Sequence, residues 1–158
     1  MNERLNRDVL QIASTLRIEE NECINIATIT YLRLLQLGYS PSLVTGSLEC
    51  NGKSIYPFPS NFTVLDLISL NDFTGHLWVE CDEYIIDIAI MFTIKKTLDL
   101  QRFLYLENVE INNIWFLARI ADLGGRNQLS YKKKYTILDL DFIETLRLGA
   151  LSWLSGNP

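Results

Sequence analysis

Residues 23–38 form the segment that most restricts what this chain can fold into. The segment reads CINIATITYLRLLQLG, and apolar side chains occupy nearly every side of a helix drawn through it. Asn21 suits the N-cap position and Gly38 suits the position just after the helix, so both ends carry helix signals. The β-branched residues would also suit a strand, but the length favours a helix. Because a helix that is apolar all round must be enclosed by other elements, the sequence predicts a buried central helix.

The remaining sequence supplies elements that can enclose this helix within one domain. The chain has 158 residues, of which 48% are hydrophobic, and this is enough for one ordinary core. Apolar positions over residues 3–17 follow the helical period, which predicts an amphipathic first helix. Asp141 and Glu144 resemble a capping box and begin a last helix that reaches about Leu154. We therefore expect a single domain over residues 1–158.

Between these helices, turn signals alternate with short apolar runs typical of an antiparallel sheet. Asn51-Gly52 supplies the positive φ angles of a two-residue type I′ turn and predicts a hairpin. Residues 57–71 contain two prolines and are expected to form a loop with at most a short helix. Further segments are a short helix over residues 97–106 and strands within 114–120 and 130–138. The fold class expected is α+β, with the buried helix packed on the sheet.

The segment GHLWVECDEYIIDIA, residues 75–89, contains the only histidine of the chain. If Asp82-Glu83 is a two-residue turn, strand alternation places His76 and Asp87 on the same face of a hairpin. The two are then diagonal neighbours, which stand roughly 7–8 Å apart and within reach of an imidazole–carboxylate hydrogen bond. A three-residue turn would reverse this arrangement.

An aspartate within the apolar run YIIDIAI needs a partner, because burying an unpaired charge costs on the order of several kcal/mol. His76 is the obvious partner for Asp87, and the carboxylate would fix the imidazole tautomer and raise its pKa. The second ring nitrogen can then accept a proton from a nucleophile. Cys23 is the candidate, because amide N–H groups and the helix dipole favour a thiolate at a helix start. A packing role in the core is the alternative for this thiol.

The other two cysteines are weaker candidates. Cys50 precedes a hairpin turn, and Cys81 points to the face opposite His76, so neither is expected to meet the imidazole. Three scattered thiols and one histidine lack the closely spaced ligands typical of zinc sites, so we expect neither a metal nor a cofactor. An odd number of cysteines in a chain of this size also predicts reduced thiols.

The charge of the chain argues against two classes of partner. Fourteen basic and nineteen acidic residues leave a net charge of −5, which opposes nucleic-acid backbones and anionic lipid surfaces. Lys132–Lys134 are better explained as the solvated face of an edge strand than as a nucleic-acid patch. The N-terminal residues lack the apolar core of a secretory signal, and no apolar run approaches the ~20 residues of a membrane span. We expect a cytoplasmic protein without nucleic-acid or membrane partners.

Three segments resemble, in order, motifs of the transglutaminase-like superfamily, whose core is papain-like. Residues 23–46 resemble its cysteine-helix motif, GHLWVE resembles its histidine strand, and YIIDI resembles its aspartate strand. The matching positions are Cys23, Ala27, Leu37, Gly38, Val44, Gly46, His76, Trp78, Glu80 and Asp87. Trp78 and Glu80 share the face of His76 in the predicted hairpin and are the expected substrate-binding residues.

The resemblance covers about residues 20–90 and implies a papain-like core. It implies Cys23 as nucleophile, His76 as general base and then acid, and Asp87 as the orienting carboxylate. Family members act on amides through a thioester, as proteases, deamidases or acyltransferases, so the expected substrate is a peptide, a protein side chain or a small amide. A papain-like fold that serves as a non-catalytic binding or regulatory module is the alternative.

Overall fold

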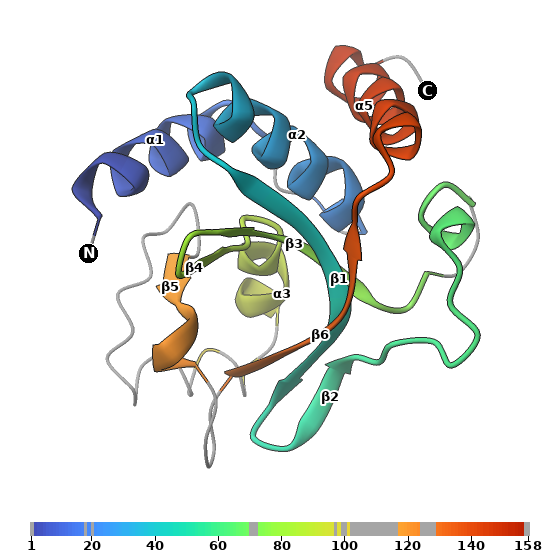
Figure 1. Cartoon of the computed structure of the whole chain (residues 1–158). Helices are drawn as coiled ribbons and strands as arrows, with labels where there is room; N and C mark the ends of the chain where they lie inside the picture. Colours follow the sequence, from blue (N-terminus) through green and yellow to red (C-terminus); the bar gives the residue numbers. More distant parts are fainter. Residues whose placement is uncertain are drawn as a thin grey trace.

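The computed structural model of the chain shows an α+β fold with a curled antiparallel sheet (Figure 1). It describes residues 2–17, 19, 21–69, 73–96, 98, 101, 117–123 and 129–156. Within this part of the chain there are four α-helices and six strands. The coarser part of the predicted fold class, α+β with a central helix on an antiparallel sheet and a helix near each end, is confirmed.

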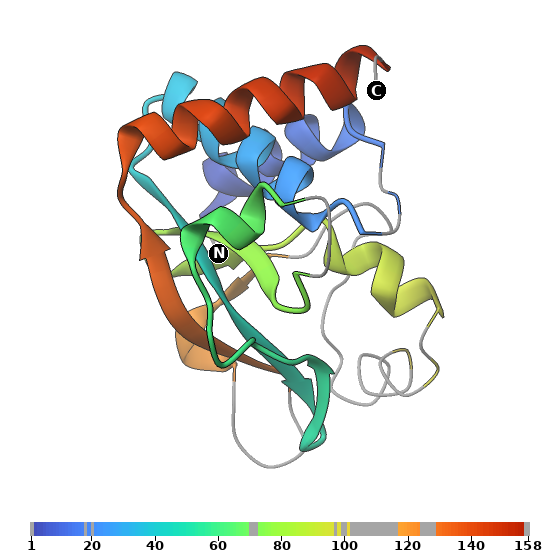
Figure 2. The ribbon, with the colours of Figure 1, turned by 90° about the vertical axis from the view of Figure 1, so that its right-hand side faces the viewer.

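Helices lie on both faces of the sheet (Figure 1). The helices are α1 (Glu3–Ser14), α2 (Cys23–Gln36), α3 (Ile90–Lys96) and α5 (Leu140–Ser155). The first two and α5 lie on one face, whereas α3 lies on the other, inside the curl of the sheet. Figure 2 shows α5 lying against α2, and Phe142, Ile143 and Leu146 of α5 are buried in the same core as the apolar residues of α2. The central position of α2 explains why its sequence is apolar on nearly every side.

The sheet is built around its longest strand. The strands are β1 (Pro41–Cys50), β2 (Lys53–Tyr56), β3 (His76–Cys81), β4 (Tyr84–Ile86), β5 (Leu117–Arg119) and β6 (Leu129–Ile137). They follow the order β2-β1-β3-β4-β5, and β6 pairs with β1. β6 pairs with β1 from Leu43 to Cys50, while β3 and β2 share the opposite edge of β1. The last long strand of the sequence therefore lies beside the first.

Both predicted two-residue turns are confirmed. Asn51 and Gly52 have φ angles of 51° and 71°, and they join β1 to β2. In the second hairpin Asp82 has a φ of 53°, and Cys81 pairs with Tyr84 as the predicted register requires. The short helix expected within residues 57–71 is the 3₁₀ turn η1 (Val64–Leu67).

The end of α2 was predicted correctly and its start was not. Gly38 has a φ of 85°, and the N–H groups of Gly38 and Tyr39 bond the carbonyls of Leu35 and Leu34, which is a Schellman motif. Asn21, the predicted N-cap, instead has a φ of 63°, so the cap position passes to Glu22, whose side chain makes no capping hydrogen bond.

The end of the first helix and the start of the last helix differ from their predicted positions by a few residues. The first helix ends at Ser14 rather than residue 17, because the hydroxyl and N–H of Thr15 both bond the carbonyl of Ile12. The last helix is capped by Asp139 rather than Asp141, since the Asp139 carboxylate accepts the N–H groups of Asp141 and Phe142.

In the middle of the chain, the strand expected to continue through residue 89 stops at Ile86, and α3 begins at Ile90. The helix expected over residues 97–106 falls mostly outside the described residues. The strands expected within 114–120 and 130–138 correspond to β5 and β6, with residues 114–116 also outside the described part. Lys132 and Lys133 on β6 form ion pairs with Glu49 and Glu80.

Among the described residues, no helix combines the length and apolar character that crossing a membrane would require.

Candidate active site

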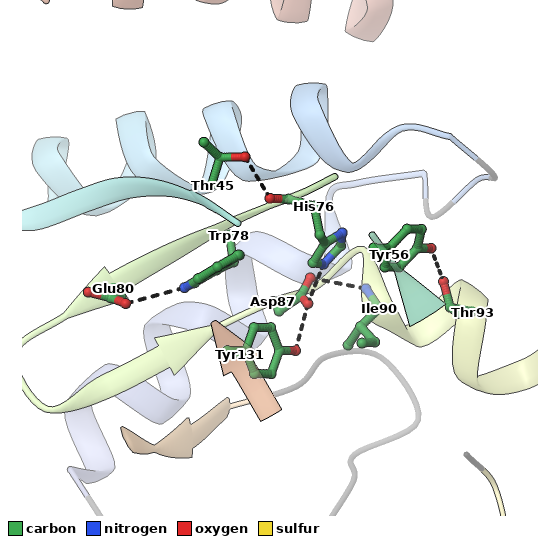
Figure 3. A network of polar contacts seen from close by, with 9 residues as sticks. All are labelled: Thr45, Tyr56, His76, Trp78, Glu80, Asp87, Ile90, Thr93 and Tyr131. Atoms are coloured by element: carbon green, nitrogen blue, oxygen red, sulfur yellow. Dashed lines mark hydrogen bonds and ion pairs between the residues drawn. The ribbon is translucent and has the colours of Figure 1, made fainter. Parts of the chain in front are cut away.

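Three elements bring the predicted Cys, His and Asp residues to one place. Cys23 is the first residue of α2, His76 is the first residue of β3, and Asp87 directly follows β4. Val79 pairs with Ile86, so the register continued by one residue makes Asp87 the diagonal neighbour of His76. The predicted contact is confirmed, with His76 Nε2 lying 2.6 Å from Asp87 Oδ2 (Figure 3).

Within the part of the chain that the structure describes, the Asp87 carboxylate accepts three hydrogen bonds although its side chain is only 1% exposed. Oδ2 accepts from His76 Nε2 and from the hydroxyl of Tyr131, at 2.6 and 2.7 Å (Figure 3). Oδ1 accepts from the backbone N–H of Ile90, the first residue of α3, at 3.1 Å. Donors on both oxygens stabilise the ionised form and offset its burial. The same carboxylate thus holds the imidazole and the start of α3.

The imidazole of His76 is fully buried and held by aromatic rings. The Tyr56 ring stacks on it with centroids 4.6 Å apart and planes within 7° of parallel. Trp78 lies on the other side, at 6.3 Å between centroids (Figure 3). The Thr45 hydroxyl donates to the His76 backbone carbonyl at 2.9 Å, which fixes the start of β3 beside β1. These contacts leave the ring little freedom to rotate.

The second ring nitrogen of His76 is the one available to Cys23. Within the described residues, Nδ1 is buried and has no hydrogen-bond partner. The Cys23 side chain nevertheless lies near enough to raise the pKa of His76, both as a hydrogen-bond acceptor and as a negative charge. Catalytic contacts of this kind are commonly long or poorly aligned before substrate binds. We regard the thiol and Nδ1 as neighbours rather than as a formed hydrogen bond.

The pKa of His76 is raised from 6.5 to about 10. Burial is the largest single influence and lowers the pKa, because it disfavours the charged imidazolium. The charge and hydrogen bond of Asp87, followed by those of Cys23, together outweigh burial. The ring is therefore an imidazolium at neutral pH.

This raised pKa makes the stability of the protein depend on pH. The folded state holds the imidazole proton more tightly than the unfolded chain, so the stabilisation is complete below about pH 6.5 and is lost as the pH rises toward about 10. In the Cys23→Ala variant, where no thiolate at that position can offset the change, we expect the free energy of unfolding to fall between pH 6.5 and 8.5 by up to ~1.4 kcal/mol per pH unit. Urea denaturation at a series of pH values measures this slope.

The double variant Cys23→Ala/His76→Gln is the control, and its free energy of unfolding should lack this slope. The interval ends at pH 8.5 because burial and then Asp82 raise the pKa of Cys81 to about 11, and that thiol adds a loss of the same sign at higher pH. A free energy of unfolding of Cys23→Ala that stays constant across the interval would show that His76 is not held as an imidazolium.

Cys23 lies at the wall of a pocket with a volume of about 610 Å³. The pocket lies between the start of α2, the segment before β3, and α3. Its lining is Glu19, Asn21, Glu22, Cys23, Ile24, Tyr56, Ser69, Phe73, Thr74, Gly75, Ala89, Phe92 and Thr93. Cys23 is half-buried, and His76 does not itself line the pocket. A ligand in this pocket would reach the thiol first, with the imidazole behind it.

Trp78 and Glu80 share the face of His76, as predicted, but neither lines the pocket. Trp78 is fully buried, and its ring meets Tyr131 edge-on with centroids 5.2 Å apart. Its indole N–H donates to Glu80, which also forms an ion pair with Lys133. β6 covers this part of the face, so the placement of the two residues supports a packing role and gives no support to the expected substrate contact.

The two remaining cysteines lie apart from the imidazole, as predicted. Cys81 packs in the core beneath α2, and Cys50 packs in the smaller core beside α3. Within the part of the chain that the structure describes, no three His, Cys, Asp or Glu side chains are grouped as a metal ion would require.

Sequence reasoning missed Tyr56 and Tyr131, the two tyrosines that complete the surroundings of His76. Both come from strands that reach the site only through β1: Tyr56 through a hairpin, and Tyr131 by pairing opposite Leu48. The pairing of β1 with β6 joins residues 79 to 94 positions apart, and no spacing in the sequence indicates it. The one feature of the sequence that could have indicated these two residues is that each is a tyrosine at an inward position of a predicted strand.

Comparisons with known proteins assign no family. No family model matches the chain, and no curated protein is significantly similar to it. The chain is similar to a crystal structure described only as that of a genomics target, at 13% sequence identity over 98% of this chain and 73% of the other. The TM-score of 0.45 is too low to support an inference about function.

Proposed function

We propose that this protein is a cysteine-dependent amide hydrolase or acyltransferase with a papain-like core, in which Cys23, His76 and Asp87 form the catalytic triad. The observation that carries the proposal is the state of His76. Its Nε2 is bonded to a buried carboxylate, while its Nδ1 has no hydrogen-bond partner among the described residues and neighbours a thiol at a pocket wall. This division of roles is what a nucleophile–base–carboxylate triad needs.

The resting site would hold a thiolate beside an imidazolium. Asp87 keeps the imidazole protonated, and a thiolate at Cys23 is stabilised by the adjacent positive charge and by the N-terminus of α2. The thiolate sulfur attacks the substrate carbonyl carbon, and the carbonyl π electrons move to oxygen. The imidazolium then gives its Nδ1 proton to the departing amine as the C–N bond breaks, which leaves a thioester on Cys23.

Resolution of the thioester reverses the proton movement. Water or an acceptor amine attacks the thioester carbonyl, His76 Nδ1 takes a proton from it, and the C–S bond breaks to restore the thiolate. Asp87 keeps its charge throughout and only holds the ring. Hydrolysis and acyl transfer differ solely in which nucleophile reaches the thioester.

The N-terminus of α2 can supply donors for the oxyanion. The first backbone bond within the helix is donated by Ile26 N–H to the Glu22 carbonyl, so the N–H groups before it have no acceptor inside the helix. The Glu22 side chain does not cap them, and Cys23 and Ile24 both line the pocket. Amide donors at this position suit the charge that develops on the carbonyl oxygen.

Alkylation by iodoacetamide tests the proposal without knowledge of the substrate. We expect Cys23 to be alkylated at pH 6 at least ~10-fold faster than glutathione, since an ordinary thiol with a pKa near 8.5 is almost fully protonated there. Cys50 and Cys81 should stay unmodified because they are only 4% and 1% exposed. Mass spectrometry of tryptic peptides gives the rate at each cysteine.

Two variants control this measurement. Cys23→Ala should abolish fast labelling, and His76→Gln should slow labelling of Cys23 at pH 6 to the rate of glutathione. If wild-type Cys23 reacts no faster than glutathione at any pH from 6 to 8, the triad is not functional, and the non-catalytic binding module becomes the better explanation.

A further inference from the structure

Tyr131 on β6 donates its hydroxyl to the carboxylate that holds the imidazole. The phenol oxygen lies 2.7 Å from Asp87 Oδ2, the same oxygen that accepts from His76 Nε2 (Figure 3). Burial, followed by the negative charge of Asp87, holds the pKa of Tyr131 well above its usual value of 10. The phenol therefore stays protonated at neutral and mildly alkaline pH, and its hydroxyl acts as a hydrogen-bond donor there.

The Tyr131 ring is held in place by close packing. It meets the Trp78 ring edge-on at 5.2 Å and lies 6.4 Å from the imidazole, measured between centroids. The approach of β6 to β1 depends on Gly46, where an added Cβ would lie 2.1 Å from the Lys132 carbonyl oxygen and 2.9 Å from Trp78. This contact between neighbouring strands sets where the hydroxyl of Tyr131 can reach.

We propose that Tyr131 is a positioning residue, whose hydroxyl fixes the Asp87 carboxylate so that His76 presents Nδ1 to Cys23. Two donors meet Oδ2, and the Ile90 N–H meets Oδ1, so the plane of the carboxylate is defined from both sides. The catalytic meaning of this role rests on the proposed function, but the hydrogen bond itself does not.

The hydroxyl matters most when His76 gives up its proton. While the imidazolium is present, its charge balances the charge of Asp87. Once the proton has moved to a leaving group, a buried carboxylate remains that, among the described residues, is stabilised by the Tyr131 hydroxyl, the Ile90 N–H and the neutral imidazole. Removal of the hydroxyl should therefore make proton release from His76 harder.

Because His76 is the only histidine of the chain, NMR can follow its titration without overlap. Among the described residues, the titratable groups that face it are Asp87, Cys23, Tyr56 and Tyr131. In Tyr131→Phe, which keeps the ring, we expect the imidazole titration midpoint to rise by about one pH unit, given the strength of a hydrogen bond to a charged group. A weaker contact of the imidazole with Cys23 would lower the midpoint. The upward shift should nevertheless prevail, because Asp87 raises the pKa of His76 more strongly than Cys23 does.

Tyr135→Phe is the matched control, since Tyr135 lies on the same strand but is 43% exposed and contacts Phe62. Its midpoint should equal that of the wild type. Iodoacetamide labelling of Cys23 at pH 6 should slow several-fold in Tyr131→Phe and remain unchanged in Tyr135→Phe, because only the first loosens the carboxylate.

An unchanged midpoint in a folded Tyr131→Phe would overturn the positioning role, even where wild-type Cys23 reacts fast. Conversely, a shifted midpoint with slow wild-type labelling would support the positioning role and reject the proposed function. If Tyr131→Phe does not fold, the contact between Tyr131 and Asp87 can be tested in the wild type. A slowly exchanging tyrosine hydroxyl proton with a nuclear Overhauser effect to the His76 Nε2 proton supports the contact, and its absence overturns it.

Discussion

Replacement of Asp87 by Asn should destabilise the protein by about 3–5 kcal/mol at pH 7, the range measured when one partner of a buried ion pair is removed. The variant keeps the shape of the side chain but removes the charge that sustains the imidazolium of His76. Burial would then dominate, and the titration midpoint of His76 should fall from about 10 to below 6.5. Urea denaturation and NMR of the single histidine measure the two effects.

The pH dependence of this loss distinguishes its cause. Measured in the Cys23→Ala background, the loss of unfolding free energy caused by Asp87→Asn should be largest below pH 6.5 and shrink as the pH approaches 10, where the His76 imidazolium loses its proton. A difference that is constant with pH would indicate lost packing or a lost bond to Ile90 instead.

Glu83→Gln is the matched control for Asp87→Asn. Glu83 lies in the turn of the same hairpin, but its carboxylate is 56% exposed and pairs with Arg119 on the surface. Exposed ion pairs contribute roughly 0–1 kcal/mol, so this variant should unfold close to the wild type and leave the His76 midpoint unchanged. A large effect at Glu83 would mean that the hairpin, rather than the buried pair, controls stability.

Replacement of Gly46 by Ala should cost about 3 kcal/mol, at the upper end of the usual penalty for overpacking. The added Cβ would lie 2.1 Å from the Lys132 carbonyl oxygen, which belongs to the backbone of β6 and cannot simply rotate away. β6 must then move from β1 and carry Tyr131 with it. We expect a lower urea midpoint together with a shift of the His76 resonances.

Gly149→Ala controls for the generic effect of adding a methyl group. Gly149 lies within α5, and an added Cβ there meets nothing within 4 Å. The change should raise stability by up to ~1 kcal/mol, because Ala favours the helix over Gly. If Gly46→Ala were equally tolerated, the close approach of β6 to β1 would not be what positions Tyr131.

The parts of the fold that were predicted correctly depend on short-range chemistry. The Asn51-Gly52 turn and the end of α2 at Gly38 both need a left-handed residue, and Gly or Asn is the residue that adopts it easily. The contact between His76 and Asp87 followed from the length of one turn, because residues in a hairpin are placed by their register.

The errors occurred where two local solutions compete. Asn21 carries an N-cap signal, yet it also tolerates a positive φ, and the chain uses it to turn into α2. The apolar run after Ile86 suits a strand, but Asp87 accepts the N–H of Ile90 and a helix begins instead. In both cases the choice depends on where the neighbouring elements lie.

The sequence by itself determined the central helix, the hairpin register and hence the pair of His76 with Asp87. Each of these features is defined by residues that lie close to one another in the sequence. Only the tertiary structure decided that Tyr131 would complete the site and that Trp78 would be buried, because β1 pairs with β6 across 79 to 94 positions of the sequence. Such a pairing depends on the packing of the whole sheet, and a single sequence carries no periodic signal for it.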